Sequence, residues 1–169
     1  MSDAATEPRR PDETGVPDPF PLMHPLLKKN YGDWKWHDRP RPGVLRHMAH
    51  SGDQVWTVRA GTQRQLDVHT IRKLCDIGDE YAEGHVRFTV RSNIEFMLSK
   101  EEMVAPLIEK LTEEGFPVGG TGNSMSMIAH TQGWLHCDIP GTDASGVVKA
   151  LMDELYEEFT NEEMPNRVR

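Results

Sequence analysis

The sequence has only two cysteines, Cys75 and Cys137, among its 169 residues. Two are too few for the disulfide framework that holds many small extracellular proteins together. It also lacks an apolar run long enough to cross a bilayer, and its N-terminus has no apolar stretch of the kind found in secretory signals. We therefore expect a soluble, cytoplasmic protein without membrane insertion.

Positive charge is scarce as well. The 19 lysines and arginines are outnumbered by 27 aspartates and glutamates, which gives a formal net charge of −8. Proteins that bind nucleic acid through its phosphates usually carry a basic footprint, so we expect no nucleic-acid partner. A local positive patch for a small anion remains compatible with this charge, because net charge does not describe a single pocket.

Residues 1–42 are predicted to form an N-terminal arm and an aromatic docking segment. Residues 1–21 contain five prolines and almost no apolar pattern, which is typical of a segment that is disordered or laid over a partner. Tyr31, Trp34 and Trp36 then occur close together among basic residues. They are either anchors for a partner protein or part of a loop that folds back and buries its tryptophans in this chain's own core.

Residues 43–117 show the periodicities of an α+β unit. The expected elements are strands at 43–50 and 54–60, a helix at 67–82, one or two strands at 85–98 with a kink near Ser92, and a helix that follows Ser99 and stops at Gly115. This order predicts a ferredoxin-like fold. Asp67 is the expected N-cap of the first helix, and Cys75 is predicted to be buried on its apolar face.

The second helix carries two local signals at its start. Ser99 and Glu102 have the spacing of a capping box. Pro106 lies too late to be the first helical residue, so it predicts either a kink or a later true start of the helix.

Two arginines alternate with apolar residues in the strand at 85–98. Val86, Phe88 and Val90 would point to one side of the strand, and Arg87 and Arg91 to the other. The arginines line either a solvated face of the sheet or a face that binds carboxylates and small oxyanions.

Residues 118–169 begin with a turn at Gly119–Gly122, whose backbone N–H groups are of a kind that can cradle an anion. A short strand is expected at 124–130. His130, His136 and Cys137 suggest a metal, but their spacing matches no zinc signature, and adjacent strand residues point to opposite faces. A single cysteine that contributes to a shared multi-thiolate cluster is the more plausible alternative.

A last helix is expected after a cap at Thr142 or Asp143. Its predicted buried stripe consists of Val148, Leu151, Met152, Leu155 and Phe159.

Five segments together carry a resemblance to a known family: GVLRHMAHSGDQVWTVRAG, HVRFTVRSNIEF, GFPVGGTG, HTQGWLHC and TDASGVVKALMDELYEEF. The patterns HTQGW-x-HC and VRFT-x-R-x-NIEF are specific, whereas GGTG adds little alone. From about Pro25 to Arg169 the sequence resembles the N-terminal part of dissimilatory sulfite reductase beta subunits. The resemblance implies an enzyme with a ferredoxin-like half-domain at 43–117, followed at 118–169 by the truncated start of a module for siroheme and a [4Fe-4S] cluster. It implies six-electron interconversion of sulfite and sulfide.

The resemblance also implies roles for individual residues. Arg87 and Arg91 correspond to the strand that binds anions and porphyrin carboxylates, and Cys137 to the first cluster cysteine. Further candidates for cofactor contacts are Asn93, Thr121, Gly122, His130, Thr131, Gln132, Trp134 and His136. For the two histidines, Thr131 and Gln132 a purely structural role remains open.

Two departures from the family pattern limit these expectations. Ser126 stands where related subunits carry another substrate-binding arginine, and the remaining cluster cysteines lie beyond Arg169. We therefore expect an inactive N-terminal fragment that needs a homologous alpha subunit, in an alpha2beta2 assembly with a small sulfur-carrier protein as a further partner. The alternative is a non-catalytic ferredoxin-like module that binds a partner protein and a small anion.

Overall fold

The computed structural model describes residue 15 and residues 18–168. Its sheet consists of β1 (Trp34–Arg41), β2 (Val44–Ala49), β3 (Gln54–Gly61), β4 (Val86–Phe88) and β5 (Asn93–Leu98). The α-helices are α2 (Pro25–Lys29), α3 (Val68–Tyr81), α4 (Val104–Glu113), α5 (Ala144–Glu154) and α6 (Tyr156–Thr160). Short 3-10 helices lie at Phe20–Leu22 (η1), Glu101–Met103 (η2) and Gly133–Leu135 (η3). None of the described helices is long and apolar enough to cross a membrane.

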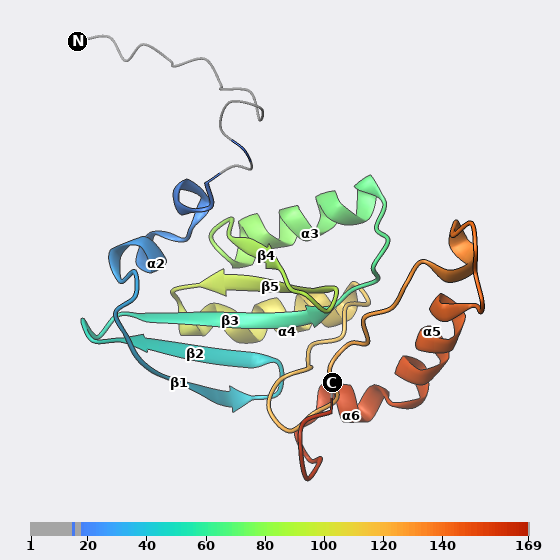
Figure 1. Ribbon diagram of the computed structural model, residues 1–169. Helices are drawn as coiled ribbons and strands as arrows, with labels where there is room; N and C mark the ends of the chain where they lie inside the picture. Colours follow the sequence, from blue (N-terminus) through green and yellow to red (C-terminus); the bar gives the residue numbers. More distant parts are fainter. Residues whose placement is uncertain (1–14, 16–17, 169) are drawn as a thin grey trace.

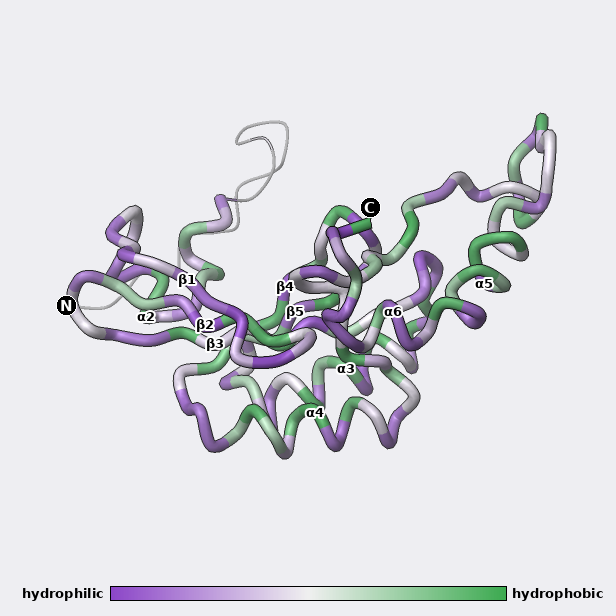
Figure 2. The backbone as a smooth tube through the Cα atoms, turned by 90° about the horizontal axis from the view of Figure 1, so that it is seen from below, coloured by the Kyte–Doolittle hydropathy of each residue, from purple (hydrophilic) through white to green (hydrophobic). Residues whose placement is uncertain are grey.

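The five strands form one antiparallel sheet in the order β1-β2-β3-β5-β4 (Figure 1). Helices α3 and α4 both cover the same face of this sheet (Figure 2). Residues of β2, β3 and β5 that point to that face form the core together with the two helices. Its fully buried members include Val44, Val58, Phe96, Leu98, Leu107 and Leu111. The α+β, ferredoxin-like fold predicted from the sequence is therefore confirmed.

The strand expected at 85–98 is divided into β4 and β5, which pair as neighbours. The chain turns between them, and Ser92 adopts a positive φ of 56° there. The Thr62 hydroxyl donates a hydrogen bond to the Ser92 carbonyl, so the bond also ties this turn to the segment after β3. At the kink predicted near Ser92, the chain thus reverses its direction completely.

Three local predictions for the helices have different outcomes. Asp67 caps α3, since its carboxylate accepts a hydrogen bond from the Thr70 N–H at 2.6 Å. The capping box is wrong, because Ser99 donates instead to the Glu83 carboxylate at 2.7 Å. Pro106 lies in the first turn of α4, as a later true start of the helix implies.

The prediction that Cys75 is buried is also wrong, because this residue is exposed on α3. The helix presents Leu74, Ile77 and Gly78 to the core, and Cys75 falls just beside that stripe.

The N-terminal aromatic segment folds back onto the sheet. Trp34 and Trp36 belong to β1, which pairs with β2, so the sheet begins within the segment assigned to the arm at 1–42. Just before it, Asn30 and Lys29 reach the Asp53 carboxylate at 2.9 and 2.7 Å. Most of the arm expected at 1–21 lies outside the described residues.

Residues 123–168 form few regular contacts with the sheet. The strand expected at 124–130 is wrong, since Met125 makes only an isolated bridge to Val168. Asp143 caps α5 by accepting a hydrogen bond from Gly146 at 3.0 Å. The stripe predicted to be buried reaches the core only through Phe159, which is 1% exposed, because α5 itself has no buried residue.

The Gly119–Gly122 loop joins these residues to the sheet. A Cβ atom on Gly119 would lie 2.0 Å from the Phe159 carbonyl oxygen, so only glycine permits this approach. The Gly120 N–H donates to the same oxygen at 2.9 Å, and the Gly119 N–H donates to the Arg59 carbonyl at 3.1 Å. These two N–H groups are therefore not available to cradle an anion.

Candidate anion-binding site

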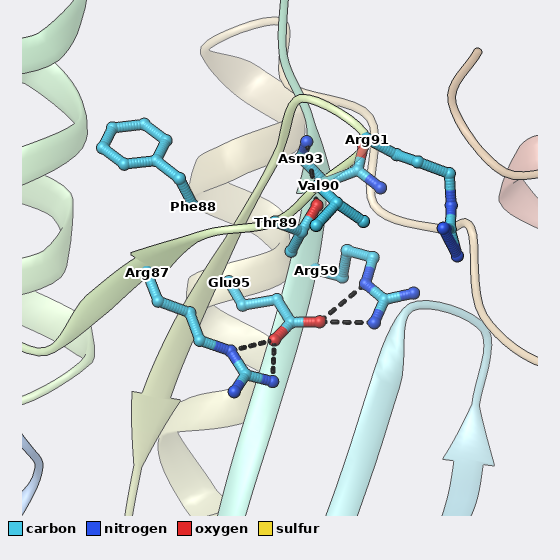
Figure 3. Close-up of a pocket in the computed structure, with 8 residues that line it drawn as sticks. All are labelled: Arg59, Arg87, Phe88, Thr89, Val90, Arg91, Asn93 and Glu95. Atoms are coloured by element: carbon cyan, nitrogen blue, oxygen red, sulfur yellow. Dashed lines mark hydrogen bonds and ion pairs between the residues drawn. The ribbon is translucent and has the colours of Figure 1, made fainter. Parts of the chain in front are cut away.

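A hollow of about 290 Å³ lies at the ends of β3, β4 and β5, and charged side chains dominate it. Because neighbouring strand residues alternate between faces, Arg59, Arg87 and Glu95 lie on the side of the sheet opposite α3 and α4. The lining residues are Arg59, Arg87, Phe88, Thr89, Val90, Arg91, Asn93 and Glu95 (Figure 3).

The Glu95 carboxylate lies between two arginines at the base of this hollow (Figure 3). Register places Arg59 of β3 and Arg87 of β4 directly beside it on the two flanking strands. Arg59 donates from Nε to Oε1 at 2.7 Å, and Arg87 donates from Nε to Oε2 at 2.6 Å. Each arginine adds a second contact of 2.5 Å from Nη2 to the same oxygen.

The two arginines differ in how much of the guanidinium group remains available to a ligand. Arg59 is 16% exposed, and its remaining nitrogen, Nη1, donates to the Gly120 carbonyl at 2.8 Å. Arg87 is 56% exposed, and no hydrogen bond within the described chain occupies its Nη1. Arg87 therefore presents one edge of its guanidinium group to a ligand, whereas Arg59 is fixed in place.

Glu95 is charged although its side chain is completely buried. Burial by itself raises the pKa of this carboxyl group, but Arg87 and Arg59 outweigh that effect and hold the pKa below its ordinary value. With Arg91 included, the hollow is lined by three guanidinium groups and one carboxylate. The hollow therefore retains an excess of positive charge.

Arg91 and Asn93 add unused hydrogen-bonding capacity. Arg91 follows β4 and extends away from the Glu95 ion pairs (Figure 3), and within the described residues no hydrogen bond or ion pair reaches it. Asn93 is 2% exposed, and its side-chain oxygen has no hydrogen-bond partner in the part of the chain that the structure describes. A buried polar atom without a partner is uncommon in folded proteins. An amide oxygen only accepts hydrogen bonds, so the capacity of the hollow to bind an anion lies in its guanidinium groups.

Thr121 and Gly122, two other candidates for cofactor contacts, are buried in the loop beneath α6. The Thr121 hydroxyl accepts a hydrogen bond from the Gly43 N–H and donates to Glu162, both at 2.7 Å. Gly122 is packed so closely against Glu162 that a Cβ atom would lie 2.4 Å from its carboxylate. Both residues hold the structure together, and neither presents a free group.

The candidates in 130–137 surround η3, away from the lining of the hollow. His130 contacts the Thr131 carbonyl through Nδ1 at 2.7 Å, and Gln132 precedes η3. Trp134 is 66% exposed, and Cys137 is also exposed. The described residues contain no group of three or more His, Cys, Asp or Glu side chains placed to hold a metal ion.

Sequence reasoning missed Arg59 and Glu95. Both alternate with buried apolar neighbours, Arg59 between Val58 and Ala60, and that pattern marks them as facing away from the core. The pattern does not reveal which strands lie side by side. Only the pairing of β3 and β4 with β5 brings the two charges together.

Comparison with known proteins gives consistent matches. The family described as "Nitrite/Sulfite reductase ferredoxin-like half domain" matches residues 47–114. The beta subunit of dissimilatory-type sulfite reductase from Archaeoglobus fulgidus is 48% identical over 155 residues, which cover 88% of this chain and 42% of that protein. The Nitratidesulfovibrio vulgaris subunit is 49% identical, with 86% and 40% covered. The Megalodesulfovibrio gigas subunit is 45% identical, with 96% and 66% covered.

The chain thus spans about two fifths of the first two relatives. Among solved structures, dissimilatory sulfite reductase I superposes with a TM-score of 0.73 at 14% identity, covering 84% of this chain and 37% of that one. At this identity the structural likeness supports the fold alone.

Proposed function

Because this chain belongs to the family of dissimilatory sulfite reductase beta subunits, we propose that it forms the part of such a subunit that holds anionic groups of siroheme. The complete subunit then interconverts sulfite and sulfide, and this chain alone is inactive. The observation that carries the proposal is the arginine hollow. It offers the free edge of Arg87 together with Arg91, which has no partner among the described residues.

The residues of the hollow fit a carboxylate-bearing tetrapyrrole. Guanidinium groups pair with carboxylates through two parallel hydrogen bonds. Val90 lies at the rim and is 87% exposed, where a flat apolar ring system would cover it. Bound siroheme would supply the iron at which the sulfur compound exchanges electrons. This chain would bind and orient its carboxylates.

The experiment is a titration of the 169-residue chain with uroporphyrin III, a porphyrin that carries several carboxylates. Arg91→Ala should weaken binding roughly ten- to a hundredfold, since it removes a charge-assisted hydrogen bond. Arg72→Ala is the matched control, because Arg72 is an exposed arginine on α3. Equal affinities for the two variants, or no binding by the unmodified chain, would contradict the proposal.

The fit to a [4Fe-4S] cluster is different. Cys137 is an exposed thiol and a suitable soft ligand for iron, but the described residues contain no group able to hold a metal by themselves. We propose Cys137 as one ligand among others supplied by the complete subunit. Cys137→Ser should then lower the iron content of that subunit. Cys75→Ser, the other exposed cysteine, should leave it unchanged, and equal iron in both variants would reject this role.

The partners follow from the same family membership. We propose a homologous alpha subunit, in an alpha2beta2 assembly, as the source of further basic residues around the substrate. Ser126 supports this proposal, because it is a buried serine at the position where related subunits carry an additional arginine. A small sulfur-carrier protein is proposed as a partner of the whole assembly.

A further inference from the structure

We infer that Glu95 and Arg59 are positioning residues of the anion site, and that they hold Arg87 in the orientation in which it binds an oxyanion. This inference rests on the proposed function and adds the mechanism by which the site is preorganised. A carboxylate inside an anion-binding hollow is at first sight unfavourable, because its charge repels the ligand. The geometry shows that this carboxylate nevertheless fixes the orientation of Arg87.

The contact with Glu95 fixes one edge of Arg87. Both Nε and Nη2 of Arg87 point to Oε2 of Glu95, at 2.6 and 2.5 Å. A planar guanidinium group held along one edge keeps only the other edge for a ligand. An arginine that is 56% exposed would otherwise sample many rotamers, and binding would have to overcome that entropy.

Arg59 holds Glu95 from the other side. Its Nε and Nη2 bind Oε1, and its Nη1 binds the carbonyl of Gly120. Glu95 is therefore clamped between two strands and anchored through Arg59 to the glycine loop. With all three guanidinium nitrogens used within the protein, Arg59 acts on the ligand through Glu95 and Arg87.

A role in packing alone does not account for this arrangement. The apolar core lies on the other face of the sheet, where Phe96 and Ile94 flank Glu95 in sequence. Burying an ion pair contributes little net stability compared with apolar residues of similar size. The ion pairs lie instead in the hollow itself, which Arg91 also lines.

Glu95 either positions Arg87 or simply balances charge, and the two explanations predict opposite changes in ligand affinity when Glu95 is replaced. If Glu95 merely offsets positive charge, Glu95→Gln removes a repulsive charge and binding should tighten. If Glu95 positions Arg87, both Glu95→Gln and Glu95→Asp should weaken binding. Aspartate keeps the charge but is one methylene shorter, so it separates geometry from charge.

The experiment measures affinities of the 169-residue chain and both variants for inorganic sulfite and for uroporphyrin III. We expect a loss of roughly three- to tenfold in each variant, the cost of one additional unfixed side chain. In parallel, the ¹⁵N–¹H signal of Arg87 Nε reports whether this group is held in the free protein. It should be protected from solvent exchange in the unmodified chain and lose that protection in both variants.

The outcomes separate the two proposals. If the unmodified chain binds neither probe, the proposed function fails. If it binds a probe and the variants bind equally well or more tightly, the positioning role is overturned while the proposed function stands. Should Glu95→Gln unfold, Glu95→Asp decides alone, since wild-type affinity in that variant also overturns the inference. Weakening for sulfite alone or uroporphyrin alone identifies which oxyanion the held arginine serves.

Discussion

Helices α4 and α5 have similar length and similar amphipathic sequences, yet they differ completely in burial. In α4, Val104, Leu107 and Leu111 are all buried in the core. In α5, no residue is buried, and Leu151 is 44% exposed. The comparison teaches that an apolar stripe of helical period predicts a helix but not the surface against which that helix packs.

Two larger regions of the molecule differ in the same way in the burial of their apolar residues. Residues 34–118 contain a complete core of sheet and two helices. Residues 123–168 are tied to it chiefly by Phe159 and the glycine loop, and α5 stands away from the sheet (Figure 2). Large apolar residues remain exposed around α5 and η3, namely Trp134, Leu135, Ile139, Val147, Leu151 and Tyr156.

The largest expected effect tests this division with one matched pair of substitutions. Leu107→Ala, in α4, should lower the free energy of unfolding by about 2–5 kcal/mol, because it leaves a cavity in the core. Leu151→Ala, in α5, should change it by about 0.5 kcal/mol or less, since the side chain is already half in water. Chemical denaturation of the 169-residue chain measures both.

Similar losses in the two variants would show that α5 shares the core after all. Hydrogen exchange distinguishes the regions further. Amides of 34–118 should open only with global unfolding, and those of α5 should exchange through local opening.

Much of the sheet and its two covering helices could be predicted because local signals and burial agree there. The alternation of β3 and the Asp67 cap of α3 are both visible in the sequence. Around residues 124–130 the local pattern suggested a strand, but the described part of the chain offers it only an isolated bridge from Met125 to Val168. A β-strand needs a neighbouring strand as well as an alternating sequence pattern. The local sequence does not identify that neighbour.

The candidate site was predicted only in part for a similar reason. Arg87 and Arg91 were identified from alternation and family resemblance, and both line the hollow. Glu95 and Arg59 were not predicted as site residues, because their ion pairs depend on the register of three neighbouring strands. Thr121 was a candidate through the family resemblance and lies in a glycine-rich loop, yet its hydroxyl donates a hydrogen bond to Glu162. A loop composition that suits an anion can equally serve close packing.

A smaller effect is expected from the ion pairs on the two helices. Glu114, at the end of α4, contacts Lys110 and Lys73 of α3 at 2.6 Å each. These contacts lower the pKa of Glu114 from 4.5 to about 2. A lowered pKa in the folded state means that the pair stabilises the protein above the unfolded pKa, and that this stabilisation is lost as the pH falls from about 4.5 towards 2.

Glu114→Gln should therefore reduce the melting temperature slightly at pH 7 and flatten its decline between about pH 4.5 and 2, because the glutamine does not titrate. The control is Asp153→Asn, which removes the corresponding i,i+4 pair with Lys149 on α5. That pair joins no second helix, whereas Glu114 links α4 to α3, so Asp153→Asn should leave the pH profile of global unfolding unchanged. Identical profiles for the two variants would mean that the link between α3 and α4 adds nothing to a pair within one helix, and the contrast between α4 and α5 would then rest on apolar burial alone.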